Sequence, residues 1–406
     1  MSYKFVKITT FYFSYLKDYY ARNPHIKSRS YSEQYQHIMS EAFGWADFYE
    51  KHLRDIGVDA FEIVANARPL QKAWALEHGI RAQGKELLIK QLKTLKPDIV
   101  FFQDSITYNG KFVDYLKQEI PSIHSIIGRC CSPYTSEQLQ NFRYFNYIIT
   151  CMPSFTLDIQ NHGLKAFQIY HAFESSLLPK INRENSYPQS DVFFAGTLLL
   201  GSGNHITRRK VFEKFLQRNI ALAVHTPLRQ EKRKIIAAKQ GAYIATHCMK
   251  KCGLGNVIPK LPILREAVKW NSFPAKDPLL RKLKPFIHPP LYGLEMLRAL
   301  SKAKIGLNVH IDAAGEYAGN MRLFEVTSVG SCLVTEHKKN IRDLFEPDKE
   351  IMTYKSVDEC VEKIKWLLEH PKEREDIAKT GQARTLKEHT YKKRAEELNE
   401  IIKANL

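Results

Sequence analysis

The sequence predicts an α/β protein built from two Rossmann-like halves. Two observations lead to this prediction: apolar strand-like segments alternate with helix-like segments, and the alternation stops at residues 177–190 and then restarts. Strands separated by helical patterns predict a doubly wound parallel sheet. The chain has 406 residues, enough for two domains with a core each. We therefore expect two such sheets facing each other across a central cleft.

The first half, residues 1–180, is expected to form the N-terminal, acceptor-binding domain. Its predicted strands are residues 5–10, 60–65, 98–103, 125–128, 147–151 and 167–171, with an amphipathic helix over 32–56. The stretch 177–190, LLPKINRENSYPQS, has the Pro and Asn content of a linker.

The second half, residues 188–388, repeats the pattern. Its predicted strands are residues 191–196, 221–226, 305–310, 332–335 and 351–354, with helices over 292–302, 320–329 and from 356 onward. Gly319 and Asn320 read as the stop and the N-cap of the helix 320–329. A final helix within 389–406 is expected to pack back towards the N-terminal domain.

Basic residues are concentrated in one segment. The chain has a formal net charge of +18, and residues 228–290 hold 14 Lys and Arg against three acids. We read 228–290 as an insertion, because it interrupts the alternation. Such an excess favours a polyanionic partner: nucleic acid, an anionic membrane face or a phosphate-bearing substrate.

The seven cysteines are scattered, several of them in apolar runs, which is typical of a reduced, cytosolic protein. His247 and Cys248 with Cys252 lack the second pair of ligands that a zinc site needs, so no metal site is expected. The N-terminus lacks a signal-peptide pattern, and no run reaches the ~18 apolar residues of a membrane span. We expect a cytoplasmic protein, held at most at a membrane surface.

Neither a P-loop nor a GxGxxG motif after a strand is present, which removes the main support for NTPase and dinucleotide functions. The best candidate for a phosphate cradle is the glycine loop after strand 191–196. Gly196 and Gly203 would let the backbone approach a ligand, and Arg208 or Arg209 would follow in the next helix. The alternative is a merely flexible turn.

The helix in GNMRLFEVTSVG carries two charged residues near its start, where helix N–H groups favour anions. Arg322 could pair with a diphosphate, and Glu325 could accept hydrogen bonds from ribose hydroxyls. The alternative is an ordinary ion pair on the helix surface.

Polar residues also follow predicted strands. His310 and Asp312 stand after strand 305–310, where α/β enzymes place reacting groups, and are the candidate catalytic residues. Asp104 and Ser105 follow strand 98–103 and could meet an acceptor. A structural histidine and a helix cap are the respective alternatives.

Several segments together resemble a known family. LYGLEMLRALSKAKIGLNVHIDAAGEYAGNMRLFEVTSVGSCLVTE, LFEPDKEIMTY and HPKEREDIAKTGQARTLKEHTYKKRAEEL are similar to the C-terminal half of bacterial family-4-like glycosyltransferases of the spore-maturation CgeB type. SYSEQYQHIMSEAFGWADFYEKHL and VANARPLQKAWALEHG resemble their N-terminal halves less distinctively.

This resemblance implies the GT-B fold and a transferase that uses a nucleoside-diphosphate sugar as donor, without metal or cofactor and with retention at the anomeric carbon. The acceptor would be a glycan, a lipid-linked molecule or a protein, in cell-surface polysaccharide biosynthesis. In the broader family, two glutamates separated by seven residues contact sugar and ribose. Glu325 matches the second; the first position falls on Tyr317, and Glu316 lies one residue too early.

Two alternative functions remain open at this stage. A nucleotide-sugar 2-epimerase has the same fold but needs several carboxylates around the sugar. A non-catalytic binder of nucleic acid would use residues 228–290, although no RRM, KH or zinc-finger pattern is present and nucleic acid is not the expected partner. As a hypothesis, residues 228–290 dock the enzyme on anionic lipid at the inner face of the membrane.

Overall fold

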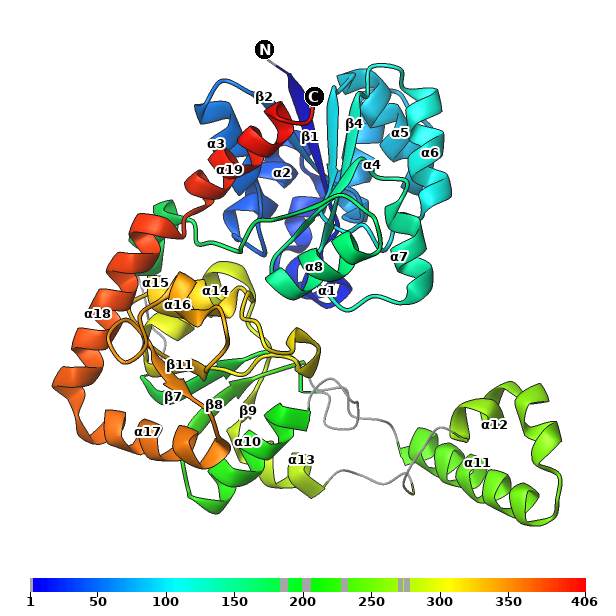
Figure 1. Cartoon of the computed structure of the whole chain (residues 1–406). Coiled ribbons are helices and arrows are strands. Elements are labelled where there is room, and N and C mark those ends of the chain that lie inside the picture. Colours follow the sequence, from blue (N-terminus) through cyan, green and yellow to red (C-terminus); the bar gives the residue numbers. More distant parts are fainter. Residues whose placement is uncertain (1–2, 183–188, 199–205, 228–232, 269–272, 274–277) are drawn as a thin grey trace.

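Two domains, each with a parallel six-stranded sheet between helices, make up the chain (Figure 1). The computed structural model describes residues 3–182, 189–198, 206–227, 233–268, 273 and 278–406. Every strand pairing in both sheets is parallel. The predicted class, two Rossmann-like domains, is confirmed.

The N-terminal sheet has the strand order β2-β1-β3-β4-β5-β6. Its strands are β1 (Lys4–Thr9), β2 (Asp59–Val64), β3 (Ile99–Phe102), β4 (Ser125–Cys130), β5 (Tyr147–Thr150) and β6 (Ala166–Gln168). Its helices are α1 (Phe13–Arg22), α2 (Tyr31–Ser40), α3 (Phe48–Asp55), α4 (Arg68–Glu77), α5 (Gly84–Leu95), α6 (Gly110–Glu119), α7 (Ser136–Phe142), α8 (Pro153–Asn161) and α9 (Leu178–Asn182). Strands β3, β4 and β5 are buried throughout, as expected for apolar strands covered by helices on both faces.

The single helix expected over residues 32–56 is wrong, because two helices, α2 and α3, occupy this stretch. Ser30 caps α2 in a capping box with Glu33. Between the helices, Ala42, Gly44 and Ala46 all have positive φ, which turns the chain. The amphipathic period continues across the turn and therefore concealed it.

The C-terminal sheet has the strand order β12-β11-β10-β7-β8-β9. Its strands are β7 (Ser190–Ala195), β8 (Leu222–His225), β9 (Ile287–His288), β10 (Ala303–Asn308), β11 (Cys332–Glu336) and β12 (Met352–Tyr354). Its helices are α10 (Ile206–Gln217), α13 (Pro278–Leu283), α14 (Gly293–Ser301), α15 (Arg322–Ser328), α16 (Ile341–Leu344), α17 (Val357–Glu369) and α18 (Pro371–Glu388). The connections run in opposite directions from β7 and from β10, so the ligand-binding crevice of such a sheet lies at the carboxyl ends of these two strands.

The basic segment divides into two parts. Helices α11 (Arg233–Lys251) and α12 (Pro262–Ala267) pack on each other through a 3-10 turn at Gly255–Lys260 and lie apart from both sheets (Figure 1). Residues 278–290 are not an insertion, because α13 packs on α10 and β9 completes the sheet. No helix in the described part of the chain is both long enough and apolar enough to cross a membrane.

The predicted linker is partly helical. Helix α9 covers Leu178–Asn182, and Arg298 of α14 donates to the Lys180 carbonyl through Nε (3.2 Å) and Nη2 (3.0 Å). Residues 183–188 lie outside the described part. The N-terminal end of this stretch is therefore attached to the C-terminal domain.

The last helix, α19 (Tyr391–Lys403), leaves the C-terminal domain and packs on α3 of the N-terminal domain (Figure 1). The Tyr3 hydroxyl donates to Asn399 Oδ1 at 2.8 Å. Where the chain crosses, Phe173 N donates to the His389 carbonyl (2.9 Å) and Tyr391 N to the Phe173 carbonyl (3.1 Å). The two domains are thus joined by backbone hydrogen bonds as well as by side chains.

Two glycines bring the backbones of the two domains together. Gly293 has φ +51°, and a Cβ there would lie 2.0 Å from the Glu41 carbonyl oxygen, to which Leu294 N donates at 2.8 Å. At Gly319 a Cβ would lie 2.3 Å from the Cys151 carbonyl oxygen. No other residue type fits either position without moving one domain.

Gly293→Ala should destabilise the protein by at least about 3 kcal/mol, since it adds steric overlap to the ~1–2 kcal/mol of left-handed backbone strain. Urea unfolding measures this. Gly79→Ala is the matched control, because Gly79 has φ +64° with nothing within 4 Å of a Cβ. Equal destabilisation by the two variants would contradict the close domain contact.

Candidate active site

Arg322 and Glu325 lie at the crevice of the C-terminal sheet. Arg322 Nη2 donates to the Ala195 carbonyl at the end of β7 (3.1 Å), and Nη1 forms an ion pair with Glu325 Oε2 (2.7 Å). The two side chains are only 20% and 14% exposed. The ion pair expected as the alternative does form, and it lies in the crevice at the end of β7.

A reciprocal amide pair positions α15. Asn320 Nδ2 donates to Asn308 Oδ1 (2.6 Å), and Asn308 Nδ2 donates to Asn320 Oδ1 (3.2 Å) and to Thr335 Oγ1 (3.0 Å). The prediction that Asn320 is the N-cap is wrong: Met321 stands there, without a side-chain cap. The Asn320 side chain instead ties the start of α15 to β10 and β11.

Three backbone N–H groups in the first turn of α15 are bonded to preceding carbonyls. Leu323 N donates to the Asn320 carbonyl (3.3 Å), and Phe324 N and Glu325 N donate to the Met321 carbonyl (3.0 and 3.1 Å). These three N–H groups are therefore engaged within the helix start. The expected anion site at this helix start stays a prediction, and the Arg322 guanidinium is its charged group.

Asp312 holds the start of α10. Its Oδ2 accepts from Ile206 N (2.6 Å), and its Oδ1 accepts from Thr207 N (3.2 Å) and Thr207 Oγ1 (2.6 Å). A carboxylate from another segment thus caps the helix that was expected to follow the phosphate cradle. This geometry gives Asp312 a structural role, and its expected catalytic role stays a prediction.

Arg208 lies beneath the crevice. It is 9% exposed and donates through Nε to the Val309 carbonyl (3.0 Å) and through Nη1 to the Thr197 carbonyl (2.8 Å). Burial lowers its pKa to about 10. Gly196 lies beside it, where a Cβ would be 3.1 Å from the Phe194 ring and 3.8 Å from Arg208 Nη1. Arg208 thus places a positive charge between the ends of β7 and β10.

Arg209, another member of the predicted cradle, forms an ion pair along its own helix. Arg209 pairs with Glu213 one turn along α10 (2.9 Å). Gly203 lies outside the described residues.

His310 is held by a carboxylate that sequence reasoning missed. Glu336, at the end of β11, accepts from His310 N (2.7 Å) and lies 3.2 Å from His310 Nδ1. Burial lowers the pKa of His310, and Glu336 offsets this only in part. With Nδ1–H directed to Glu336, Nε2 of the neutral ring is an acceptor, and it is buried without a partner among the described residues. Glu336 is the last residue of strand CLVTE, and this position at a strand end could have marked it as a candidate site residue.

The loop before α15 does not bring Tyr317 or Glu316 to the ion pair. Glu316 is 68% exposed and pairs with Lys339 (2.6 Å). Tyr317 is half-buried in the same loop, with its backbone N bonded to the Ala314 carbonyl (3.3 Å). Neither residue therefore takes the place of the first of the two glutamates that contact the donor in the family.

The N-terminal domain contributes polar groups after neighbouring strands. Cys131, Cys151 and His171 follow β4, β5 and β6, and their donor atoms lie within 4.8 Å of one another. Among the described residues, these three have the atom types and the spacing that could hold a metal ion. His247, Cys248 and Cys252 are not part of this group. The carboxyl ends of parallel strands meet at one edge, which was the signal for this cluster.

Asp104 and Ser105 are used within their own domain. Asp104 accepts from Ile106 N and Thr107 N (both 3.0 Å) and caps a local turn. Ser105 is buried and donates to the Arg129 carbonyl (2.7 Å). These contacts fit the structural interpretation of both residues.

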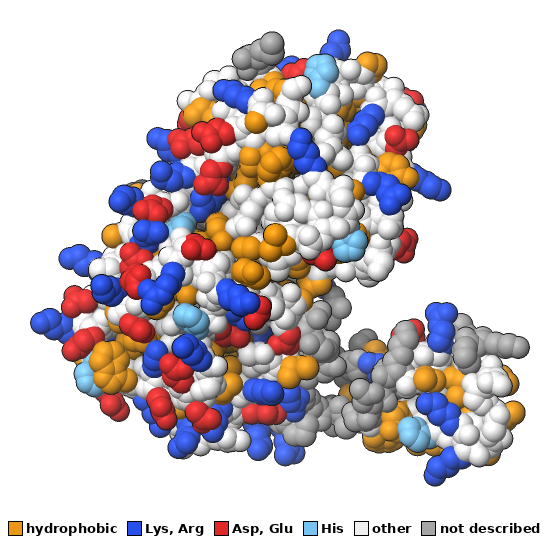
Figure 2. Space-filling view, in the orientation of Figure 1, with side chains coloured by type: hydrophobic (Ala, Val, Ile, Leu, Met, Phe, Trp, Pro, Cys, Tyr) orange, Lys and Arg blue, Asp and Glu red, His pale blue; other side chains and the backbone are white. Residues whose placement is uncertain are grey.

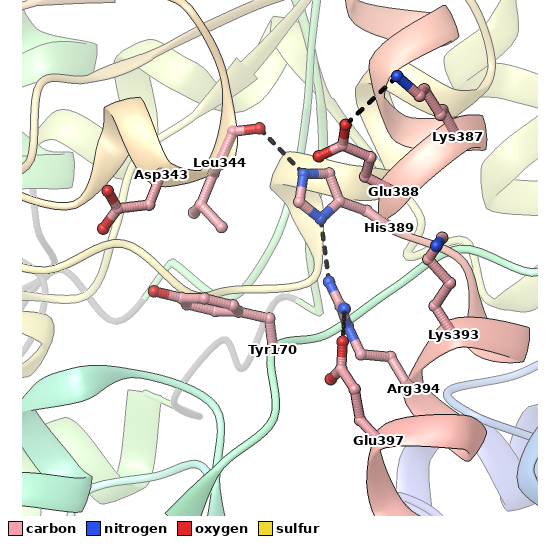
Figure 3. A pocket seen from close by; sticks show the side chains of 9 residues that line it. All are labelled: Tyr170, Asp343, Leu344, Lys387, Glu388, His389, Lys393, Arg394 and Glu397. Carbon is pink, nitrogen blue, oxygen red and sulfur yellow. Dashed lines mark hydrogen bonds and ion pairs between the residues drawn. The ribbon is translucent and has the colours of Figure 1, made fainter.

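A polar pocket of about 390 Å³ lies where the two domains join (Figure 3). At its centre His389 Nε2 bonds to the Leu344 carbonyl (2.9 Å), and Arg394 Nη2 donates to His389 Nδ1 (2.9 Å). Arg394 also pairs with Glu397 (2.5 Å). Burial lowers the pKa of His389 to about 4, so the ring is neutral at pH 7. These contacts join α16, α18 and α19, so the pocket belongs to the domain junction and lies outside the crevice.

Comparison with known proteins shows a partial family match and a shared fold. Residues 266–400 match the model of a family described as glycosyl transferase-like, and no curated protein matches the sequence. The fold is similar to a glycosyltransferase from Rickettsia africae (TM-score 0.56, 10% identity, covering 100% of this chain and 98% of that chain). It is also similar to Anabaena HepE in complex with UDP and glucose (TM-score 0.57, 10% identity, covering 99% of this chain and 100% of that chain). A third similar structure is sucrose-phosphate synthase from Thermosynechococcus elongatus (TM-score 0.54, 9% identity, covering 99% of this chain and 98% of that chain).

This chain accordingly has the GT-B fold of these glycosyltransferases. The fold expected from the resemblance is confirmed, and the class of enzyme stays a prediction that the match of residues 266–400 supports. The finer assignment to the CgeB type stays a prediction.

Asp312→Ala should reduce the free energy of unfolding by about 1–2 kcal/mol through loss of the α10 cap. Asp312→Asn is the control, since its amide oxygen can still accept from the helix start. Unfolding in urea measures both. Unchanged stability of Asp312→Ala, together with a hundredfold or greater loss of kcat, would support the catalytic assignment.

Proposed function

We propose that the enzyme transfers a sugar from a uridine-diphosphate sugar to a glycan, a lipid-linked molecule or a protein. The single observation that carries the donor proposal is the Arg322–Glu325 pair at the carboxyl end of β7. The HepE structures contain UDP and UDP-glucose, and a Burkholderia xenovorans trehalose-phosphate synthase of similar fold is UDP-forming (TM-score 0.50, 12% identity). These relatives support the choice of uridine.

Donor binding would exchange partners at this pair. A diphosphate offers Arg322 two oxygens in the fork geometry that guanidinium prefers, and so competes with Glu325. Glu325, once released, accepts hydrogen bonds from the ribose hydroxyls. Arg322 then neutralises the charge that develops on the leaving diphosphate. Donor binding would therefore bring Arg322 to the diphosphate and Glu325 to the ribose at the same time.

His310 is proposed to bind the donor sugar. Its Nε2 is a buried acceptor without a donor, and such a group is expensive to leave unsatisfied. A sugar hydroxyl would supply the missing hydrogen bond. Retention at the anomeric carbon, independence of metal and a role in cell-surface polysaccharide synthesis are parts of the proposal that rest on the family resemblance alone. A cytoplasmic location is proposed from the scattered cysteines of the sequence.

Glu325→Gln should weaken UDP binding at least about tenfold, because loss of the carboxylate removes its charged hydrogen bonds to ribose. Inorganic pyrophosphate should bind the variant as well as or better than wild type, since Arg322 has lost its intramolecular competitor. Calorimetric titration with both ligands measures this difference. Arg322→Gln should weaken both.

Glu295→Gln is the matched control, since Glu295 pairs with Arg298 at the same spacing on α14 (2.8 Å). It should leave both affinities unchanged. Equal effects of Glu325→Gln on UDP and pyrophosphate would contradict the ribose role. With UDP-glucose and an acceptor, release of UDP indicates transfer, whereas an epimerised donor would favour the 2-epimerase.

The pair of helices α11 and α12 is proposed to dock on anionic lipid. Basic side chains outnumber acidic ones within 233–268. The described acid there is Glu266, and the described basic side chains are Lys234, Lys239, Lys250, Lys251 and Arg265. Six apolar side chains there are between 40% and 53% exposed: Ile235, Ile244, Leu254, Val257, Leu261 and Val268. Figure 2 shows basic and apolar side chains intermixed on this part of the molecule. Basic charge with exposed apolar side chains is typical of segments that lie in the membrane interface.

Replacing Lys250 and Lys251 by Gln should weaken binding to vesicles containing phosphatidylserine roughly thirtyfold, from about 1 kcal/mol per lysine. Co-sedimentation at 0.1 M salt measures this. Lys372→Gln with Lys379→Gln on α18 is the matched control and should have no effect. Equal binding to neutral and anionic vesicles would rule out the electrostatic docking.

A further inference from the structure

Two cysteines meet on the cleft side of the N-terminal domain. Cys131 follows β4 and is half-buried, whereas Cys151 follows β5 and is 1% exposed. Both sulfur atoms lie within 4.8 Å of each other and of a ring nitrogen of His171. The donor site described above uses neither of them.

Beside them lies a buried cation without a carboxylate partner. Arg129 is 3% exposed and stacks on Trp45, with 4.1 Å from the guanidinium carbon to the ring centre. Its Nη2 donates to the Ile169 carbonyl (3.2 Å), and its Nε donates to Cys131 Sγ (3.1 Å). Among the described residues no Asp or Glu forms an ion pair with it. Arg stays protonated, and a buried charge needs a counter-ion.

Cys131 is the group that can supply this charge. Burial on its own would raise the pKa of the Cys131 thiol, but the hydrogen bond from Cys151 and the charge of Arg129 lower it well below its usual range. Burial raises the pKa of Cys151, so its thiol stays protonated and can donate. Burial lowers the pKa of His171, so that ring is neutral. The geometry carries the pairing: Arg129 Nε donates to Cys131 Sγ at 3.1 Å, and a thiolate at this sulfur balances the guanidinium, so the pair is neutral.

The same atoms could also ligate a soft metal, but the charges favour the thiolate. A zinc ion with two thiolates is neutral as a unit, and would leave Arg129 buried without a counter-ion. With a single thiolate and no metal, the cluster is already balanced. Zinc binding is therefore an outcome that the experiment must distinguish.

We propose that Cys131 and Cys151 are a peroxide-sensitive pair of thiols at the interdomain cleft. The Cys131 thiolate attacks one oxygen of hydrogen peroxide: an S–O bond forms, the O–O bond breaks, and hydroxide leaves and takes up a proton as water. The Cys151 sulfur, giving up its proton, then attacks the resulting sulfenic acid, so that an S–S bond forms and the S–OH group leaves as water. Two thiols are oxidised and one peroxide is reduced to two waters.

Oxidation has a structural consequence, because it removes the counter-ion of Arg129. After disulfide formation, the Arg129 guanidinium would keep its hydrogen bond to the Ile169 carbonyl and its stacking on Trp45, and would have no anionic partner. The Cys151 carbonyl also lies against Gly319 of the other domain. We expect the oxidised protein to melt at a lower temperature than the reduced one, opposite to the usual effect of a disulfide. The inference does not depend on the identity of the sugar donor.

Reactivity as a function of pH tests the thiolate. The groups facing Cys131 are Arg129, Cys130, Cys151, His171, Tyr12 and Tyr49. The rate of peroxide consumption by Cys131 should change less than about twofold between pH 6.5 and 8.5. An ordinary thiol with pKa ~8.5 gains about fiftyfold in thiolate over this range. Free cysteine in the same buffer supplies that reference.

Peptide mass spectrometry of the full-length protein after peroxide treatment tests the disulfide. The wild type should lose two hydrogens in a Cys131–Cys151 cross-link, and Cys151→Ser should stop at a sulfenic acid on Cys131. Cys131→Ser should give neither product, and Cys248→Ser with Cys252→Ser should behave like wild type. Failure of peroxide to modify Cys131, a rate that rises with pH as for free cysteine, or one bound zinc per chain that blocks oxidation would each overturn the proposal.

Discussion

The close approach of two backbones at Gly293 and Gly319 is the constraint on which the active cleft depends. Each glycine leaves no space for a side chain, so the C-terminal domain meets Glu41 and Cys151 of its partner domain directly. The crossing at His389 adds backbone hydrogen bonds to the same junction. Because backbone cannot be displaced like a side-chain tip, these contacts fix how the strand ends of one domain face those of the other.

The crevice of the C-terminal domain is organised by charges that are bonded to strand-end carbonyls. Arg208 and Arg322 bind the carbonyls of Val309, Thr197 and Ala195, which is where the sheet reverses its order of connection. At the nearby helix starts, Asp312 accepts from the first N–H groups of α10, and preceding carbonyls accept from Leu323 N, Phe324 N and Glu325 N of α15. The guanidinium groups are the charged donors for a diphosphate here, and Glu325 competes for one of them.

Two buried cations of the N-terminal domain share one aromatic ring. Lys7 Nζ lies 5.7 Å from the centre of Trp45 and is paired with Glu62 (2.8 Å), whereas Arg129 stacks on the same ring without a carboxylate. Burial raises the pKa of Glu62 to about 8, which shows how strongly this interior opposes charge. In such surroundings the sulfur of Cys131 becomes the natural partner of Arg129, so a chemical property of the cleft follows from the packing around one tryptophan.

The sequence by itself determined the two parallel sheets, since apolar runs of strand length separated by helical periods have few other solutions. It also placed Arg322, Glu325 and His310 near strand ends. Only the tertiary structure decided their partners: Glu336 for His310, Asn308 for Asn320 and the α10 start for Asp312 are 12 to 106 residues away. The Cys131 and Cys151 cluster, likewise, exists because β4 and β5 are neighbours in the sheet. Local periodicity reports which face of an element is buried, but a buried polar group is satisfied by whatever the fold brings beside it.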